Sequence, residues 1–458
     1  MEETLKVKEN KIKDSDKMGS MPIGRLLASM AWPAILSMTI NAMYNIIDSI
    51  FVAQISQEAL TAVSFVMPVQ ILMIAVSVGS GVGVNSLISR RLGAKRQRDA
   101  DLAACTSIRI GLINYIIFLL IGIFLTVPFM HHYTDDTETF VAGTSYMRIV
   151  LCFSVFMAIE IILEKVLQST GNMITPMICS MSGAVVNTIL DPILIFGLFG
   201  LPALGVTGAA IATVIGQACT LIVATIIIIK KESAVKIKLV GFKTDWGIVK
   251  DIYAVGFPSI IMQAIGSLML LGYNTVLSAE PIAVAVLGIY FKIQSFIFMP
   301  VFGLSQGAMP VMGYNYGSKN RLRLMKTFKL ALFAALIIMA IGTALFQLFP
   351  EFFLKLFNAD ENMLAMGVPA LRRISLCFIP AAFGIITSTL FQGTGNGFYS
   401  LFGSLIRQLI VVLPMAYILY NLGGVEMSWF SFPLAEIVGL AYSAIMLSYL
   451  YKKQIKQL

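Results

Sequence analysis

The chain has 458 residues, of which 58% are hydrophobic and only 12% are charged, whereas a soluble domain has roughly 25% charged residues. This composition excludes a water-soluble fold and predicts a protein whose solvent is lipid. The net charge of +9 does not indicate a nucleic-acid partner, because the basic residues are dispersed among short loops without an accompanying aromatic face.

Hydrophobic runs predict an all-α, polytopic membrane protein with twelve transmembrane helices, because each run is long enough to cross a bilayer. The runs of the first half cover residues 26–53, 59–88, 104–127, 143–167, 174–197 and 207–229. Those of the second half cover residues 247–276, 282–312, 327–348, 366–391, 400–420 and 427–450. Trp32, Trp246 and Trp429 fall near the ends of runs, where an indole ring favours the membrane interface.

Lys and Arg residues gather in alternate segments between the runs, and cytoplasmic loops carry an excess of these residues. The basic segments are the N-terminal arm, the loops at 90–98, 230–243 and 319–323, and the C-terminal tail. Lys355 is the clear exception in the other set of loops. We therefore expect a multi-pass protein of the cell membrane with both termini in the cytoplasm.

A recurring motif indicates an internal duplication. The string Q-x-T-G-N at Gln168–Asn172 returns at Gln392–Asn396, a shift of 224 residues. The same shift pairs Gln70 with Gln294, Gly79 with Gly303, Gly83 with Gly307, Gly93 with Gly317 and Lys95 with Lys319. Since each half has an even number of spans, both six-helix lobes enter the membrane in the same direction, related by a pseudo-two-fold axis along the membrane normal.

The duplication also predicts the domain organisation of the chain. The expected parts are a cytoplasmic N-terminal arm (1–24), a first six-helix lobe (25–229), a cytoplasmic linker (230–246), a second six-helix lobe (247–450) and a cytoplasmic tail (451–458).

No G-x-x-x-x-G-K-[ST] phosphate-binding loop occurs. Transport is therefore expected to use an ion gradient rather than ATP hydrolysis.

Two carboxylates inside first-half runs are the strongest candidates for this coupling. A charged residue at the centre of a transmembrane helix costs about 2.5–3.5 kcal/mol on insertion scales, so Asp48 and Asp191 are expected to be functional. Both lie roughly 7–9 Å below the outer rim, at a rise of about 1.5 Å per residue, and could share one site. The shift of 224 or 225 residues places uncharged residues opposite them, namely Gly272 or Tyr273 and Met415 or Ala416.

Polar residues accompany both carboxylates. A stripe on the first helix contains residues three or four apart, namely Asn41, Tyr44, Asn45 and Asp48. On the fifth helix, Asn187 lies one turn from Asp191. Since polar stripes in lipid face protein or water, these helices are predicted to line a cavity in the first lobe. Desolvation would make H+ uptake by either Asp possible near neutral pH, whereas the carboxylate and amide oxygens of Asp48, Asn187 and Asp191 could equally hold Na+.

Further polar residues are candidates for a substrate cavity. They are Asn41, Tyr44, Glu160, Gln217, Lys292 and Gln294. Glu160, one turn from Glu164 on the fourth helix, could attract a cationic substrate. For Lys292 and Arg407, snorkelling to the interface or neutralising a carboxylate is the alternative.

Several strings together resemble the multidrug and toxic compound extrusion (MATE) antiporters, over nearly the whole chain. They are Pro33–Val52 with Tyr44-Asn45 and Asp48, Gly79-x-Gly81-x-Gly83 running to Arg90-Arg91-x-Gly93-Ala94, Asn187-x-x-x-Asp191-Pro192, Gly208-Ala209-Ala210-x-Ala212-Thr213 and both Q-x-T-G-N strings. The resemblance implies a V-shaped pair of lobes that exports cationic amphipathic drugs or toxins in exchange for H+ or Na+.

Within the family, the sequence is most similar to the DinF-like prokaryotic branch. That similarity implies a first-lobe cation site at the positions of Asp48, Asn187, Asp191 and Thr213, and Asn45 from the polar stripe completes the predicted cation-coupling set. Asparagines that some members carry on the fourth helix fall at Glu160 and Glu164 here. The second-lobe acidic residues of the other bacterial branch are absent.

The predicted function is therefore an alternating-access antiporter in the lipid bilayer that exports several drugs. It is expected to act as a monomer, with no cofactor besides the coupling ion. One alternative is a flippase for a lipid-linked precursor, which would need a more basic cavity, and Lys292 and Arg407 make that possible although acids balance them. Another alternative is a membrane-embedded enzyme, because Gly303–Gly307 matches the G-x-S-x-G motif of hydrolases. Against it, no predicted strand precedes this string, and the only histidines of the sequence, His131 and His132, belong to the other half.

Overall fold

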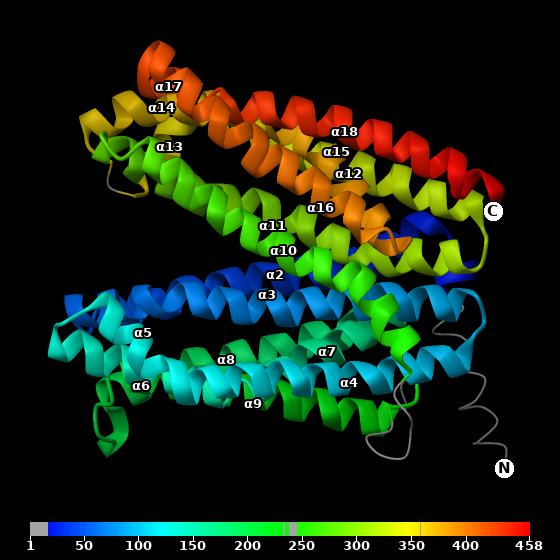
Figure 1. The fold of residues 1–458 in the computed structure, drawn as a ribbon, viewed down its shortest axis with the longest axis horizontal. Coiled ribbons are helices and arrows are strands. Elements are labelled where there is room, and N and C mark those ends of the chain that lie inside the picture. The colour runs from blue at the N-terminus through cyan, green and yellow to red at the C-terminus, as the bar shows by residue number, and fades with distance from the viewer. Residues whose placement is uncertain (1–16, 232–233, 238–244, 358) are drawn as a thin grey trace.

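The protein is helical throughout the part of the chain that the structure describes. This computed structural model describes residues 17–231, 234–237, 245–357 and 359–458, and these ranges contain helices, turns and no strand (Figure 1). A helix satisfies its backbone hydrogen bonds internally, as lipid requires. The all-α prediction is confirmed, and Ser305 of the G-x-S-x-G string lies inside a continuous helix rather than after a strand.

The first half contains helices α2 to α9, several of which begin at a side-chain cap. The Ser56 hydroxyl accepts a hydrogen bond from the Ala59 amide at 3.0 Å, and Asp136 accepts one from the Thr139 amide at 2.8 Å. The helices are α2 (Ile23–Ala53), α3 (Gln57–Gly93), α4 (Gln97–Leu120), the π-helix η1 (Ile121–Leu125), α5 (Thr126–Tyr133), α6 (Thr137–Cys152), α7 (Val155–Ser169), α8 (Ile174–Phe196), the 3-10 turn η2 (Leu198–Gly200) and α9 (Val206–Lys231).

The second half contains helices α10 to α18, with comparable caps. The side chains of Asn320 and Asp360 accept hydrogen bonds from the backbone amides of Arg323 and Met363. The helices are α10 (Trp246–Val276), α11 (Pro281–Gly317), α12 (Arg321–Leu348), α13 (Pro350–Lys355), α14 (Glu361–Ser375), α15 (Phe378–Gly393), α16 (Gly397–Leu405), the π-helix η3 (Ile406–Val411), α17 (Val412–Ser428), α18 (Ser431–Lys453) and the 3-10 turn η4 (Ile455–Gln457).

The helices include enough membrane-spanning segments for a multi-pass protein. Among the described residues, ten helices are long and apolar enough to cross a bilayer, and α14 with α15, bent by 46°, gives an eleventh. The predicted run 143–167 is instead divided between α6 and α7 at Phe153 and Ser154. The break between α14 and α15, at Leu376 and Cys377, lies within one residue of the equivalent position under the 224-residue shift. The prediction of an all-helical polytopic membrane protein is thus confirmed; twelve spans were predicted, and the described residues give ten, or eleven with the bent pair.

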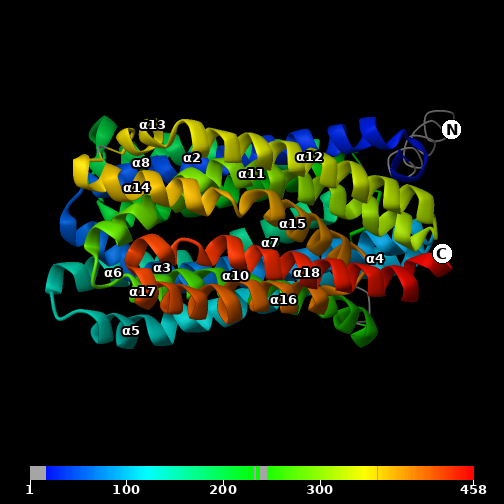
Figure 2. The ribbon, with the colours of Figure 1, turned by 90° about the horizontal axis from the view of Figure 1, so that it is seen from above.

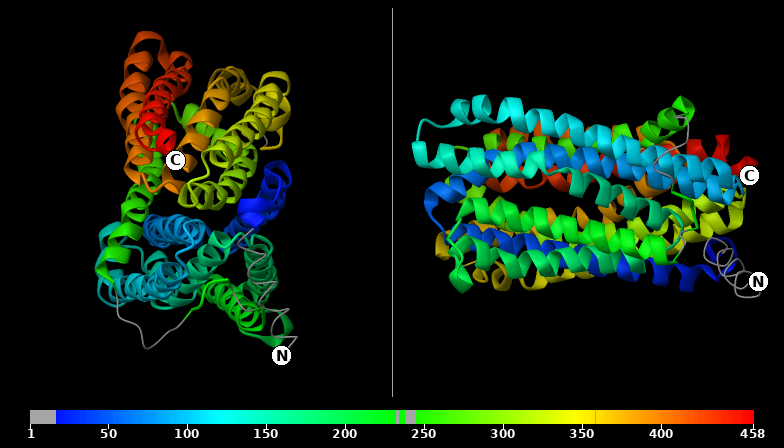
Figure 3. Two further views of the ribbon diagram at one scale, coloured as in Figure 1. Left: turned by 90° about the vertical axis from the view of Figure 1, so that its right-hand side faces the viewer. Right: turned by 90° about the horizontal axis from the view of Figure 1, so that it is seen from below.

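The two halves of the chain form two groups of helices that lie side by side. Figure 1 places most of α2–α9 below and most of α10–α18 above, with the start of α10 reaching down beside α4, and the end view in Figure 3 separates the two groups in the same way. Figure 2 shows that most helices run along one common axis. The groups meet mainly where α3 packs on α10 and α2 packs on α11.

Glycines allow the helix backbones to approach each other closely at these two contacts. A methyl group added to Gly83 of α3 would lie 2.1 Å from the carbonyl oxygen of Ile252 in α10. One added to Gly307, the residue paired with Gly83 by the 224-residue shift, would lie 2.8 Å from the backbone of Ala31 in α2. Small residues allow such close approach of helix backbones in membranes. The two contacts are therefore equivalent in the two halves.

The duplication extends to backbone conformation. Lys95 and Lys319, which follow α3 and α11, both have a φ of 57°. Gly171 and Gly395 of the two Q-x-T-G-N strings have φ values of 87° and 89°, a region that only glycine adopts without strain. The motif therefore recurs because the same left-handed turn follows α7 and α15.

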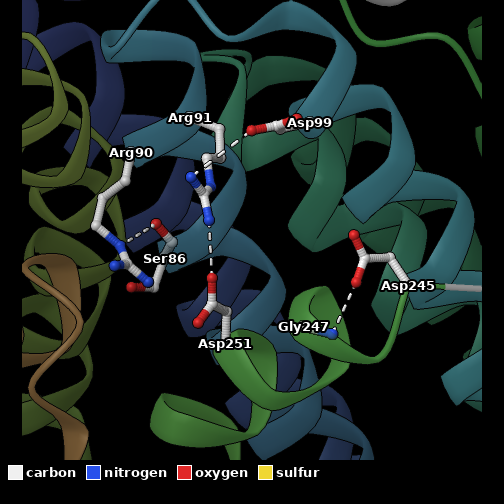
Figure 4. A network of polar contacts seen from close by, with 7 residues as sticks. All are labelled: Ser86, Arg90, Arg91, Asp99, Asp245, Gly247 and Asp251. Atoms are coloured by element: carbon white, nitrogen blue, oxygen red, sulfur yellow. Dashed lines mark hydrogen bonds and ion pairs between the residues drawn. The ribbon is translucent and has the colours of Figure 1, made fainter.

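One end of the molecule is closed by contacts between the two groups. Arg91 of α3 forms an ion pair with Asp251 of α10 at 2.8 Å and lies 3.6 Å from Asp99 (Figure 4). At the same end, a methyl group on Gly93 would lie 1.9 Å from the carbonyl oxygen of Tyr314. No space for a passage remains between these two backbones.

Both described ends of the chain lie at this closed end. The carbonyl oxygen of Met18 accepts hydrogen bonds from Asn315 and Arg323, and Gln454 is bonded to Tyr316 and Asn396. The basic loops that follow α3 and α11 therefore lie beside the start and the end of the described chain.

The prediction that all three tryptophans lie at the interface is wrong for Trp429. Trp32 and Trp246 are exposed, whereas Trp429 is fully buried and stacks on Tyr273 with ring centroids 6.0 Å apart. The ring packs among residues of the second helix group, so proximity to a span end does not place it at the surface.

We predict that Gly83→Ala lowers the unfolding temperature of the purified protein. The added methyl group has no room against Ile252, and overpacking costs about 1–3 kcal/mol. Gly288→Ala in α11 is the matched control, because nothing lies within 4 Å of the added methyl group there. Equal unfolding temperatures for the two variants would contradict the close contact.

Candidate functional site

The two candidate carboxylates come together from different helices. Asp48 of α2 is half-buried, Asp191 of α8 is fully buried, and the two lie close enough to interact electrostatically. Asp48 Oδ1 and both carboxylate oxygens of Asp191 have no hydrogen-bond partner among the described residues. A buried carboxylate without a partner is strongly unfavourable in its charged form.

Polar side chains from three helices surround this pair. Asn187, one turn before Asp191, is buried and donates through Nδ2 to Thr213 Oγ1 of α9 at 3.5 Å, while its own Oδ1 has no partner among the described residues. Thr213 is also hydrogen-bonded to Tyr44 of α2, which itself lies within electrostatic range of both carboxylates. Thr213 therefore links the first and fifth predicted helices through the sixth.

The chemistry of this oxygen cluster suits a small hard cation. Its unpartnered oxygens come from Asp48, Asn187 and Asp191, and oxygen is the ligand type that hard cations prefer. A proton would equally relieve the repulsion between two nearby carboxylates. The described residues contain no group of three or more His, Cys, Asp or Glu arranged for a metal ion, and the side chain of Asn45 lies outside the described part of the structure.

A cavity of about 350 Å³ opens beside the cluster within the first group of helices. Its lining includes the predicted residues Asn41, Tyr44, Glu160 and Gln217, together with Asn187 and Thr213 of the cluster. Glu160 and the neighbouring Glu164 each have one buried oxygen without a partner among the described residues. The cavity therefore places unpartnered carboxyl oxygens next to the Asp48–Asp191 pair.

Two predicted cavity residues lie elsewhere. Lys292 is exposed, and its ammonium group lies over the ring of Phe357 at 5.9 Å. Neither Lys292 nor Gln294 lines this cavity or a second one of about 430 Å³ among the helices of the second group. On α11, the residues that line these cavities are Phe302, Ser305, Gln306 and Met309.

Sequence reasoning missed two residues of the site, Tyr146 and Lys165. Tyr146 of α6 accepts a hydrogen bond from Gln70 at 3.3 Å and interacts electrostatically with Asp48 and Asp191. Lys165 is buried and donates to Gln168 at 3.0 Å and to Gln306 of the other helix group at 3.2 Å. The recurrence of Gln70 and Gln168 under the 224-residue shift was the available signal.

The fold and this site define the class of the protein. Two duplicated helix groups with buried carboxylates beside a cavity are typical of an ion-coupled membrane transporter. The MatE family model matches residues 33–193 and 258–418, more than half of the chain, and the protein therefore belongs to the MatE family. The second match begins 225 residues after the first, at 258 against 33, in agreement with the repeat.

Individual relatives resemble the chain over nearly its whole length. It is 25% identical to the multidrug export protein MepA of Staphylococcus saprophyticus, over 92% of this chain and 93% of that protein. It is also 25% identical to MepA of Staphylococcus haemolyticus, over 94% and 95%. A solved structure described as the outward-facing conformation of a multidrug resistance MATE family transporter of the MOP superfamily matches with a TM-score of 0.88 and 27% identity, covering 95% of this chain and 98% of that one.

We predict that Thr213→Val reduces cation-driven transport about tenfold, since it removes a hydroxyl bonded to both Asn187 and Tyr44, and one such bond contributes about 0.5–1.5 kcal/mol. The measurement is the initial rate of ethidium efflux from proteoliposomes. Thr225→Val is the matched control on the same helix, because that exposed hydroxyl bonds only to the Leu221 carbonyl of its own helix. A similar loss in both variants would argue against a role for the cluster.

Proposed function

We propose that this protein is a secondary active multidrug exporter that moves cationic amphipathic small molecules outward in exchange for H+ or Na+ by alternating access. The observation that carries the proposal is the Asp48–Asp191 pair: Asp48 Oδ1 and both oxygens of Asp191 are buried with no hydrogen-bond partner among the described residues, beside a cavity lined by Glu160 and Glu164. A site of this kind favours whichever positive charge reaches it.

In the proposed cycle, the coupling cation and the drug compete for the same lobe. Entry of H+ or Na+ neutralises Asp48 and Asp191 and removes their repulsion. The hydrogen bond that Asn187 donates to Thr213, and the one between Thr213 and Tyr44, transmit this change to α2, α8 and α9. Rearrangement of these helices then narrows the neighbouring cavity and releases the drug outward.

The names of the relatives support the same direction of transport. MepA proteins are described as multidrug export proteins, and the solved structure is described as a multidrug resistance transporter. Drugs as substrates, and the acids Glu160 and Glu164 as attractants for their positive charge, are part of our proposal. Asn45 is retained in the proposed cation-coupling set, and Asn41, Tyr44 and Gln217 are proposed to contact substrate.

We assign the protein to the DinF-like branch because its acidic pair occurs only in the first half. The equivalent second-half positions are uncharged: Gly272 or Tyr273, and Met415 or Ala416. We further propose that residues 25–229 and 247–450 are the two lobes, joined by the linker 230–246 and flanked by the arm 1–24 and the tail 451–458. In this assignment the protein acts as a monomer in the cell membrane.

The closed end, where the basic loops and both described ends of the chain lie, is proposed to face the cytoplasm, following the excess of Lys and Arg. In this orientation the described conformation is shut to the cytoplasm by the Arg91–Asp251 ion pair and the Gly93–Tyr314 contact.

The charge of the cavities favours drug export over flipping of a lipid-linked precursor. Together, the two cavities are lined by two basic residues, Lys165 and Arg407, and by three acids, Glu160, Glu164 and Glu436. A pyrophosphate head group would require an excess of positive charge. Lys292, which the alternative also needed, lines neither cavity.

We expect Asp48→Asn and Asp191→Asn each to abolish coupled export while leaving membrane expression unchanged, because an amide cannot take up a proton and binds Na+ more weakly than a carboxylate does. The measurement is ethidium efflux from proteoliposomes under a proton gradient alone and then a sodium gradient alone. The gradient that drives the wild type identifies the coupling ion.

Asp136→Asn serves as the control, since this exposed aspartate caps α6 outside the predicted spans. Export at the wild-type rate by either Asp48→Asn or Asp191→Asn, under the gradient that drives the wild type, would refute the coupling assignment.

A further inference from the structure

A second cavity, of about 430 Å³, lies mainly among the helices of the second group. Carboxamides and hydroxyls line much of it, and its charged residues are Arg407 of η3, Glu436 of α18 and Lys165 at its rim. Lys165, Gln168, Gln306 and Met38 line both this cavity and the first one. The two cavities therefore meet at the contact between the helix groups.

The second cavity is the duplicated counterpart of the first. Under the 224-residue shift, residues that line the first cavity fall on residues that line the second. The pairs include Met38 with Met262, Gln168 with Gln392, Ser180 with Ser404 and Ala184 with Gln408. Because the two cavities are equivalent, their lining residues can be compared position by position, and each difference shows where the two cavities differ in chemistry.

The charged positions differ in sign between the two cavities. Glu160 and Glu164 of the first correspond to the uncharged Gly384 and Ser388 of the second. Conversely, Gly183 of the first corresponds to Arg407 of the second. At these equivalent positions, the first cavity has two acids and the second has uncharged residues. The second cavity has the guanidinium of Arg407 at the position where the first has a glycine.

The Arg407 side chain is held in place with donors to spare. Its Nη1 lies 3.1 Å from Glu436 Oε1, and its aliphatic part lies beside Gly439, where an added methyl group would be 3.3 Å from its Cδ. A guanidinium has five N–H donors in a planar fork. Among the described residues, the contacts of Arg407 involve only Nη1, so the other two nitrogens remain available to a ligand.

The backbone at this position is also unusual. Arg407 and Gln408 lie in the π-helix η3, and both line the cavity, although adjacent residues of an α-helix point about 100° apart. π-helical segments often occur at functional sites. Nearby, the buried Asn85 Oδ1 and the hydroxyls of Ser305 and Ser388 line the same cavity without a partner among the described residues.

We propose that this second cavity binds the oxyanion of an amphipathic ligand, a carboxylate or a phosphate, through Arg407 and the hydroxyls around it. Arg pairs with such groups through two parallel hydrogen bonds. Glu436 keeps Arg407 paired when no ligand is bound and gives way when an anion enters. The protein then has separate sites for the two signs of charge, and this inference does not depend on how Asp48 and Asp191 couple export.

The test uses two probes that share a fluorophore and differ in charge. Dansylglycine carries a carboxylate, and dansylcadaverine carries an ammonium group. Their equilibrium binding is measured by fluorescence titration with the full-length protein in phosphatidylcholine nanodiscs, where no transport is required. We expect Arg407→Gln to weaken dansylglycine binding about tenfold or more and to leave dansylcadaverine binding within about twofold.

Glu436→Gln distinguishes a ligand site from a structural ion pair. Because it releases Arg407, we expect it to strengthen dansylglycine binding, whereas loss of a purely structural pair would weaken both probes in both variants. Arg373→Gln is the matched control, since Arg373 pairs with Glu426 at 2.8 Å in the same helix group but lines neither cavity. Glu160→Gln is expected to weaken only dansylcadaverine.

The source of the oxyanion follows from the lipid composition. If phosphatidylglycerol in the nanodiscs competes with dansylglycine in the wild type but not in Arg407→Gln, the natural occupant is a lipid phosphate. If it does not compete, the occupant is a soluble anion. Either result supports the site, whereas absence of dansylglycine binding, or an unchanged affinity in Arg407→Gln, overturns it.

Discussion

The two halves of this protein are held together by close contacts between helix backbones. Lipid tails are as apolar as the helices themselves, so association in a bilayer depends on close packing and polar contacts. Gly83 against Ile252 and Gly307 against Ala31 provide such packing at two equivalent positions. Because α3–α10 and α2–α11 supply most of the contact between the groups, space is left inside each group for a cavity.

Polar bonds between the groups are few, and two are well placed for a transporter. The Arg91–Asp251 ion pair joins α3 to α10 at the closed end. Lys165 joins α7 to Gln306 of α11 where the two cavities meet. A buried ammonium group bonded to neutral amides beside two unpaired acids has an alternative partner, Glu164, within electrostatic range. Lys165 and Gln306, which form this bond between the two halves, line both cavities.

Duplication of the fold was followed by separation of charge. Backbone features recur almost unchanged, as in the left-handed turns at Gly171 and Gly395. Several side chains that line the two cavities also recur, but the charges differ at equivalent positions: Glu160 and Glu164 have uncharged counterparts in the second cavity, and Arg407 takes the place of Gly183. A common scaffold with different linings offers amphipathic molecules two chemically distinct environments within one membrane protein.

The sequence alone determined the class, the repeat and the candidate acids. Long apolar runs must be helices in lipid because only internal hydrogen bonds satisfy their backbones, and the 224-residue shift follows from strings such as Q-x-T-G-N. Asp48 and Asp191 were found because a charge inside an apolar run is costly. Their neighbours Asn41, Tyr44 and Asn187 followed from helical spacing.

Only the tertiary structure decided which polar residues meet. Tyr146 and Lys165 resemble ordinary residues of a helix in the sequence, yet packing brings one to the carboxylates and the other to Gln306. Lys292 and Gln294 were expected in a cavity and line neither, and Trp429 is buried rather than interfacial. Helical periodicity predicts which residues share one face of a helix. Which other helix packs against that face, and at which residues, depends on the tertiary structure.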